Sequence, residues 1–147
     1  MKVIWYIGIA LLILGLVGFA LTPEPIEKSI IVNQAKYQVE LYEDGKLITS
    51  YPSTSGKLGS LTKTGSFHIL SKEEDVAGIY GNFPLWVGVY TVRGFENGIH
   101  SIEGENEWEE CIGVKNCTPG SIILYPDDMK DLYEWVEVGT SVVIESI

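Results

Sequence analysis

The sequence predicts a single mainly β domain, a β-sandwich or barrel-like sheet with one short C-terminal helix, preceded by an N-terminal transmembrane helix. Three observations predict this: an uncharged apolar run at the N-terminus, many short alternating runs separated by turn residues, and one late stretch with helical periodicity. A chain of 147 residues is long enough for one domain and an anchor, and too short for two full domains.

The N-terminal run, residues 3–21, carries no charge. As a helix it would rise about 28 Å, close to the roughly 30 Å thickness of the hydrocarbon core of a bilayer. Lys2 precedes the run and Glu24 and Glu27 follow it, so the positive-inside rule places the N-terminus in the cytoplasm and the rest of the chain outside. A cleaved signal peptide is the alternative, and both interpretations export the domain.

These features divide the chain into three parts. Residues 1–21 are the membrane anchor or signal peptide, residues 22–28 are a linker, and residues 29–147 are the domain. Pro23 and Pro25 stiffen the linker, because proline fixes φ and blocks continuation of a helix.

Alternation of apolar and polar residues predicts the strands. Residues 37–42 alternate as a half-buried strand does, and Asp44-Gly45 predicts a hairpin turn because these residues tolerate positive φ. The other runs expected to form strands are 29–33, 47–51, 65–70, 85–92, 98–102 and 121–125. The acidic stretch 103–110 is expected to be a solvated loop.

One helix is predicted over residues 127–138. Its apolar residues recur at helical spacing: Met129, Leu132, Tyr133 and Val136. Pro126 favours the start of the helix and Gly139 its end. Residues 141–145 then form a closing strand.

The composition excludes several classes of function. A formal net charge of −10 argues against binding to nucleic acids or anionic lipid headgroups. Two histidines leave too few ligands for a zinc site if the two cysteines are paired in a disulfide, and no glycine-rich phosphate loop is present. No cofactor is therefore implied. Outside the cytoplasm, Cys111 and Cys117 can form a small-loop disulfide.

The order of the segments resembles that of the L,D-transpeptidase catalytic domain, from about Ser29 to Ile144. The resemblance begins with the hairpin 37–51 and continues through several short motifs to the terminal helix and strand. Residues 53–57 look like the family's "stGk" segment, and residues 62–67 look like its "TPxGxF" segment with Lys63 in place of proline. Residues 80–86 are similar to the segment before the active-site histidine, and residues 98–101 look like the histidine motif with Ser101 in place of glycine. Residues 118–124 fall where the family has its cysteine signature.

This resemblance implies acyl transfer on the stem peptides of bacterial peptidoglycan, and thus a role in cell-wall biogenesis by a domain on the extracytoplasmic side of a bacterial plasma membrane. The family's cysteine attacks the amide after a meso-diaminopimelate residue and expels D-alanine. Here the signature departs at two positions, because Ser121 stands in place of the cysteine and Ile123 in place of the usual arginine.

Three interpretations of the site remain open. In the first, which makes the chain an acyltransferase, Ser121 is the nucleophile and His100 its base. Ser101 would orient the imidazole, and the backbone N–H of Gly120 or Ser121 would bind the oxyanion. In the second, Cys117 is the working thiol, unless it is paired with Cys111. In the third, the domain is catalytically inactive and binds wall peptide or a partner.

A sortase-like thiol transferase is a lesser alternative, since it is also an anchored β-barrel. That enzyme would need a catalytic arginine after its cysteine. The only arginine of this chain, Arg93, precedes both cysteines, which counts against this alternative.

Overall fold

The structure, a computed structural model, describes residues 24–147 with the exception of residues 79 and 105. The predicted anchor, residues 1–21, lies outside this described part. Within it, no helix is both long and apolar enough to cross a membrane.

The described residues form one sheet of nine strands. In chain order these are β1 (Lys28–Asn33), β2 (Gln38–Glu43), β3 (Lys46–Thr54), β4 (Gly65–His68), β5 (Ser71–Gly78), β6 (Gly81–Val92), β7 (Phe95–His100), β8 (Ile122–Leu124) and β9 (Ser141–Glu145). A short 3-10 helix, η1 (Glu109–Cys111), precedes β8, and the helix α2 (Pro126–Trp135) follows it. The mainly β fold with a short C-terminal helix is thus confirmed.

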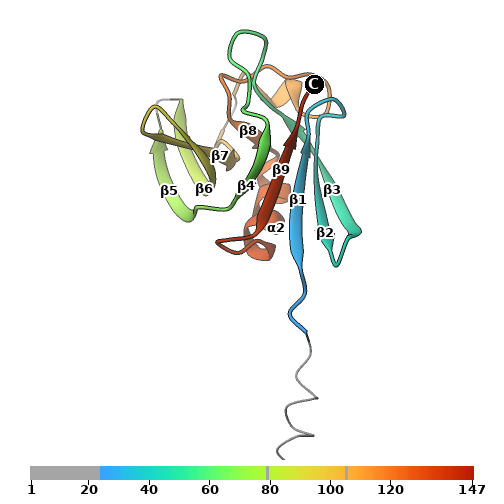
Figure 1. The fold of residues 1–147 in the computed structure, drawn as a ribbon. Helices are drawn as coiled ribbons and strands as arrows, with labels where there is room; N and C mark the ends of the chain where they lie inside the picture. Colours follow the sequence, from blue (N-terminus) through green and yellow to red (C-terminus); the bar gives the residue numbers. More distant parts are fainter. Residues whose placement is uncertain (1–23, 79, 105) are drawn as a thin grey trace, which may run out of the picture.

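The strand order is β4-β9-β1-β2-β3-β8-β7-β6-β5. All neighbours are antiparallel except β1 with β9 and β7 with β8. The long β3 joins the two halves of the sheet, because it pairs with β2 and, through Ser53 and Thr54, with β8. Figure 1 shows β5, β6 and β7 on one side of the molecule and β1, β2 and β3 on the other.

Two hairpin turns have the backbone conformation that their residues favour. Asp44 and Gly45 have φ values of 48° and 74° between β2 and β3, as the sequence predicts. Arg93 and Gly94 have φ values of 51° and 85° between β6 and β7. Positive φ at both central residues matches the twist of the flanking strands, so each turn fixes the register of its hairpin.

Two parts of the expected element order were wrong. The strand β5 was not predicted, because its acidic residues 73–75 are exposed at the edge of the sheet and do not alternate. The stretch 103–110 is not solvated throughout, because Trp108 in it is only 7% exposed and η1 begins at Glu109. The helix also ends at Trp135, three residues before the predicted end.

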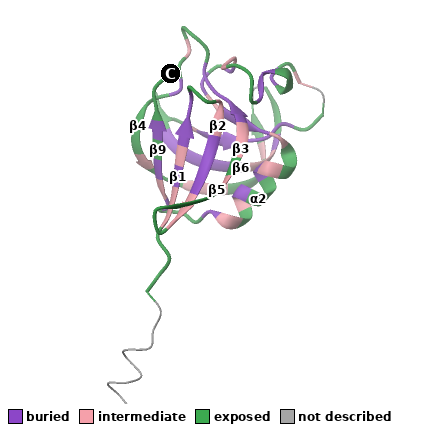
Figure 2. Cartoon of the chain, turned by 90° about the vertical axis from the view of Figure 1, so that its right-hand side faces the viewer, coloured by how far each residue is buried: buried purple, intermediate pink, exposed green. Residues whose placement is uncertain are grey.

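The interior contains two separate groups of buried side chains. The first, called the main core, is largely aliphatic: Ile30, Val32, Val39, Leu41, Ile69, Val87, Val89, Tyr90, Ile99, Ile122, Leu124, Met129, Leu132, Val136, Val142 and Ile144. The second, called the aromatic cluster, is smaller: Phe83, Trp86, Ile102, Trp108, Ile112 and Ile123. Figure 2 shows buried stretches along β1, β2 and β9, which belong to the main core, and an α2 that is partly buried.

Candidate functional site

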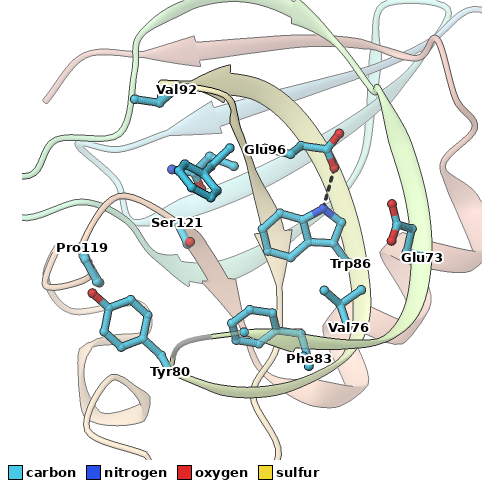
Figure 3. Close-up of a pocket in the computed structure, with 13 residues that line it drawn as sticks. Glu73, Val76, Tyr80, Phe83, Trp86, Val92, Glu96, Pro119 and Ser121 are labelled. Carbon is cyan, nitrogen blue, oxygen red and sulfur yellow. Dashed lines mark hydrogen bonds between the residues drawn. The ribbon is translucent and has the colours of Figure 1, made fainter.

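A cavity of about 720 Å³ lies beside β5, β6 and β7. Apolar and aromatic side chains form most of its wall: Val76, Tyr80, Phe83, Trp86, Val92 and Phe95. Its polar side chains are few: Glu73, Glu96, Asn97 and Ser121. Figure 3 shows Ser121 and Pro119 across the cavity from Trp86 and Glu73. A mostly apolar cavity with a few convergent polar groups is typical of a ligand site.

Ser121 borders this cavity at the end of the loop that enters β8. The loop is held by Thr118, whose hydroxyl donates a hydrogen bond to the Ser121 carbonyl at 2.6 Å and accepts one from the Gly120 N–H at 3.1 Å. The Gly120 N–H, proposed from the sequence as an oxyanion donor, is therefore already engaged within the loop. The turn presents the Ser121 side chain without tying it to another residue by a hydrogen bond within the described part of the chain.

The Gly120 carbonyl is fixed from two other segments. The Thr62 hydroxyl donates to it at 2.8 Å and the Tyr90 hydroxyl at 3.3 Å. Gly120 has a φ of 128°, which disfavours any residue with a side chain, and an added Cβ would lie 3.3 Å from Nδ2 of Asn97. Burial raises the pKa of the Tyr90 hydroxyl, so this group remains a neutral donor. The position of Ser121 is thus defined by a rigid backbone.

His100 lies at the end of β7, opposite Trp86 on β6 and Ile123 on β8. Its ring is only 2% exposed and stacks on Phe83 and Trp86, with ring centroids 4.1 and 5.3 Å away. Its Nδ1 lies 3.1 Å from the carbonyl oxygen of Ser101. Burial lowers the pKa of His100 to about 4, because desolvation disfavours the imidazolium more than the Ser101 carbonyl stabilises it.

His100 and Ser121 come from adjacent segments of the sheet but are not joined by a hydrogen bond. His100 is paired with Ile123 in the ladder of β7 and β8, and Ser121 directly precedes β8. The cavity, however, is walled by Phe83 and Trp86, the rings that stack on the imidazole. Among the described residues no hydrogen bond connects the imidazole to the Ser121 hydroxyl. At neutral pH the imidazole is uncharged and shielded.

Cys117 is bonded to Cys111 in a disulfide, the pairing anticipated from the sequence. Cys117 thus has no free thiol while this bond is intact. Its backbone N–H donates to the Thr54 hydroxyl at 3.2 Å, and that hydroxyl donates to the Lys115 carbonyl at 2.8 Å. These contacts attach the start of the 117–121 loop to the end of β3.

Ile123 stands where the resemblance predicts an arginine. Its side chain is 2% exposed and belongs to the aromatic cluster. No arginine or lysine is among the described residues that line the cavity. Nor do any three His, Cys, Asp or Glu side chains of the described residues gather as a metal site would require.

Sequence reasoning found some of these residues and missed others. Trp86 is buried and also lines the cavity, while Trp108 is buried in the aromatic cluster. Tyr90 and Glu96 were missed. In the sequence Tyr90 has the pattern of a core residue, and Glu96 has that of an ordinary surface charge near a turn. The residue that relates to the position of Glu96 is Gly88, because an added Cβ at position 88 would contact the carboxylate of Glu96.

Comparison with known proteins identifies the family and agrees with the fold. The family model YkuD, described as the L,D-transpeptidase catalytic domain, matches residues 27–144. No curated protein matches the chain. Among solved structures, an L,D-transpeptidase from Mycobacterium smegmatis is 22% identical with a TM-score of 0.70, over 82% of this chain and 59% of that one.

Two further solved structures are similar. L,D-transpeptidase 3 from Mycobacterium tuberculosis, in complex with a faropenem-derived adduct, is 19% identical with a TM-score of 0.70, over 82% of this chain and 61% of that one. A cysteine-to-serine mutant of the Enterococcus faecium L,D-transpeptidase is 27% identical with a TM-score of 0.65, over 81% of this chain and 50% of that one. The chain thus spans between half and about three fifths of the length of these structures.

Proposed function

Because this chain belongs to the L,D-transpeptidase catalytic domain family, we propose that it binds the stem peptides of bacterial peptidoglycan in the cavity bordered by Ser121. The observation that carries the proposal is the place of this cavity. It opens beside Ser121, the residue that the sequence resemblance suggests for the nucleophile position of the family's signature. Its volume of about 720 Å³ lies within the range of roughly 300–1,000 Å³ in which proteins bind small ligands.

The shape and chemistry of the cavity suit a peptide. Trp86 and Phe83 stack with ring centroids 5.7 Å apart and offer a flat apolar wall, and Phe95 is 78% exposed at the hairpin between β6 and β7. Large, rigid aromatic side chains contribute contact area at small entropic cost. The buried loop contacts around Gly120 keep the opposite wall in place.

We propose that binding, rather than catalysis, is the activity of this site. A serine hydroxyl needs a base within hydrogen-bond reach to attack an amide, since its own acidity is far too low. The only hydrogen bond of the imidazole of His100 within the described part is the one to Ser101. A pKa of about 4 also makes His100 a weak proton acceptor at neutral pH. These observations support the inactive, peptide-binding interpretation.

Acyl transfer by Ser121 is the second candidate, favoured by the fact that this serine borders the cavity on a rigid loop. In that reaction the Ser121 oxygen would bond to the carbonyl carbon of the stem amide, and His100 would take the hydroxyl proton and return it to the departing D-alanine. An amine of a second stem peptide would then displace the serine ester. This path requires the buried imidazole of His100 to come within hydrogen-bond reach of the Ser121 hydroxyl.

Titration calorimetry and intact-protein mass spectrometry with a tetrapeptide stem test the proposal on the full-length chain. We expect saturable binding to the wild type, loss of binding in Trp86→Ala, and an unchanged protein mass after prolonged incubation. A mass increase by the acyl group that disappears in Ser121→Ala would instead establish the second candidate. Absence of binding to the wild type would overturn both.

We also propose that residues 3–21 hold the domain on the outer side of a bacterial plasma membrane. The support is the uncharged run and the charge difference across it. We expect the protein to remain with the membrane fraction after alkaline carbonate extraction and to be degraded by protease added outside the cell. Release into the medium at a reduced mass would show a cleaved signal peptide instead.

A further inference from the structure

The charged groups of the cavity are of one sign. Glu73 on β5 and Glu96 on β7 both line it, and no lysine or arginine is among its described lining residues. Lys72, the neighbour of Glu73, extends to the other face of the sheet, where its Nζ donates to the Val136 carbonyl at 2.8 Å. A ligand that places a positive charge next to these carboxylates is therefore favoured over an anionic ligand.

The carboxylate of Glu96 is held in a fixed position. Its Oε1 accepts a hydrogen bond from the Trp86 indole N–H at 2.7 Å and another from the Ser71 hydroxyl. It crosses β6 above Gly88, where an added Cβ would contact both the Glu96 carboxylate and the Ser71 hydroxyl. Figure 3 shows the Glu96 side chain reaching toward the indole at the cavity wall. Glycine at position 88 thus provides the space that Glu96 occupies.

The indole of Trp86 lies beside this carboxylate. Trp86 is paired with Glu73 across the ladder of β5 and β6, so Glu73 lies on its other side. The face of a tryptophan attracts an ammonium group through the ring quadrupole, most strongly where water is partly excluded. A fixed carboxylate, a second carboxylate and an indole face together offer the contacts that a primary ammonium group makes.

We propose that Glu96 determines specificity by binding the side-chain ammonium of the diamino acid in the stem peptide, an inference that rests on the proposed function. The charge of the cavity further indicates a side chain whose ammonium has no carboxylate beside it, as in lysine. The second carboxylate of meso-diaminopimelate would be brought near Glu73 and Glu96, and like charges at such a distance repel each other. The cavity thus selects among stem peptides by charge.

Three tetrapeptides that differ at one side chain test this inference on the full-length chain by titration calorimetry. They carry lysine, Nε-acetyl-lysine or meso-diaminopimelate at the third position. We expect the lysine peptide to bind roughly fivefold more tightly than the acetylated one, since a partly exposed ion pair contributes a modest share of affinity. Equal affinities of these two peptides, or tighter binding of the diaminopimelate peptide, would overturn the inference.

Variants separate recognition from overall charge. Glu96→Gln keeps an oxygen that accepts from the Trp86 indole and removes the charge, so we expect it to lose most of the preference for the lysine peptide over the acetyl-lysine peptide. Glu74→Gln removes the same charge from a residue outside the cavity lining and should keep the fivefold preference. An undiminished preference in Glu96→Gln would contradict the assignment. If no peptide binds the wild type, the proposed function itself fails.

Discussion

The main core and the aromatic cluster share strands β6 and β8 but differ in their chemistry. On β6, Val87 points into the main core and Trp86 into the aromatic cluster. On β7, Ile99 belongs to the main core while His100 stacks on the rings of the aromatic cluster. The main core holds the two halves of the sheet together, whereas the aromatic cluster contacts the imidazole of His100 and borders the cavity. We therefore expect stability to depend mainly on one face of these strands and peptide binding on the other.

A cavity in the main core should have the largest effect on stability. Leu132 on α2 is fully buried, and Leu132→Ala removes its packing without touching the binding cavity. We expect the free energy of unfolding, measured by chemical denaturation, to fall by about 2–5 kcal/mol. Peptide affinity measured under folded conditions should be unchanged. A large loss of affinity in a fully folded variant would show that the two faces are not independent.

The aromatic cluster should make stability depend on pH through His100. Its pKa in the folded protein is about 4, below the ordinary value of 6.5, so the unfolded chain takes up the proton first as the pH falls. The contribution of His100 to the free energy of unfolding is therefore complete above pH 6.5 and is lost progressively toward pH 4, by up to about 3 kcal/mol.

Denaturation of the wild type and of His100→Gln at a series of pH values measures this pH-dependent contribution of His100 to the free energy of unfolding. The difference between their free energies of unfolding should change between pH 6.5 and 4 and be constant above pH 7. The contribution of Glu137, whose pKa is lowered by Lys28, is present in both proteins and cancels. A difference that does not vary with pH would contradict the buried, neutral imidazole.

The disulfide next to the aromatic cluster should contribute less. Cys111 and Cys117 are six residues apart, and closing so short a loop restricts the unfolded chain by an amount worth about 2 kcal/mol. We expect the double variant Cys111→Ala, Cys117→Ala to lose about that much stability. Because Ser121 follows on the same loop, peptide affinity should fall too, unlike in Leu132→Ala. Unchanged affinity would show that Thr118, Thr62 and Tyr90 suffice to position the loop.

The strands and the helix that form the main core could largely be predicted from the sequence. Alternation, the Asp44-Gly45 turn and the helical spacing from Met129 are local signals, and each corresponds to an observed element. The strand β5 could not be predicted, because an edge strand with exposed acids has no buried face to reveal it. Trp108 was likewise concealed within an acidic stretch, although burial of its large ring outweighs the charges around it.

The site was predictable only in part. Motif order suggested Ser121 and His100 as site residues, but it gave no indication of the rings of Phe83 and Trp86 that contact the imidazole. Such stacking depends on neighbours that β6 supplies across the sheet, and no local pattern encodes it. Glu96 was missed for the same reason, because its role arises from the space above Gly88.

A titration of the ¹⁵N-labelled full-length chain with a tetrapeptide stem, followed through the indole N–H signals of its tryptophans, shows directly whether the cavity binds the peptide. Trp86 lies on the cavity wall, whereas the Trp135 indole donates to Glu43 at 2.8 Å, outside the cavity lining. We predict a saturable shift of the Trp86 signal with no shift of the Trp135 signal. A Trp86 signal that does not respond to saturating peptide would contradict the account.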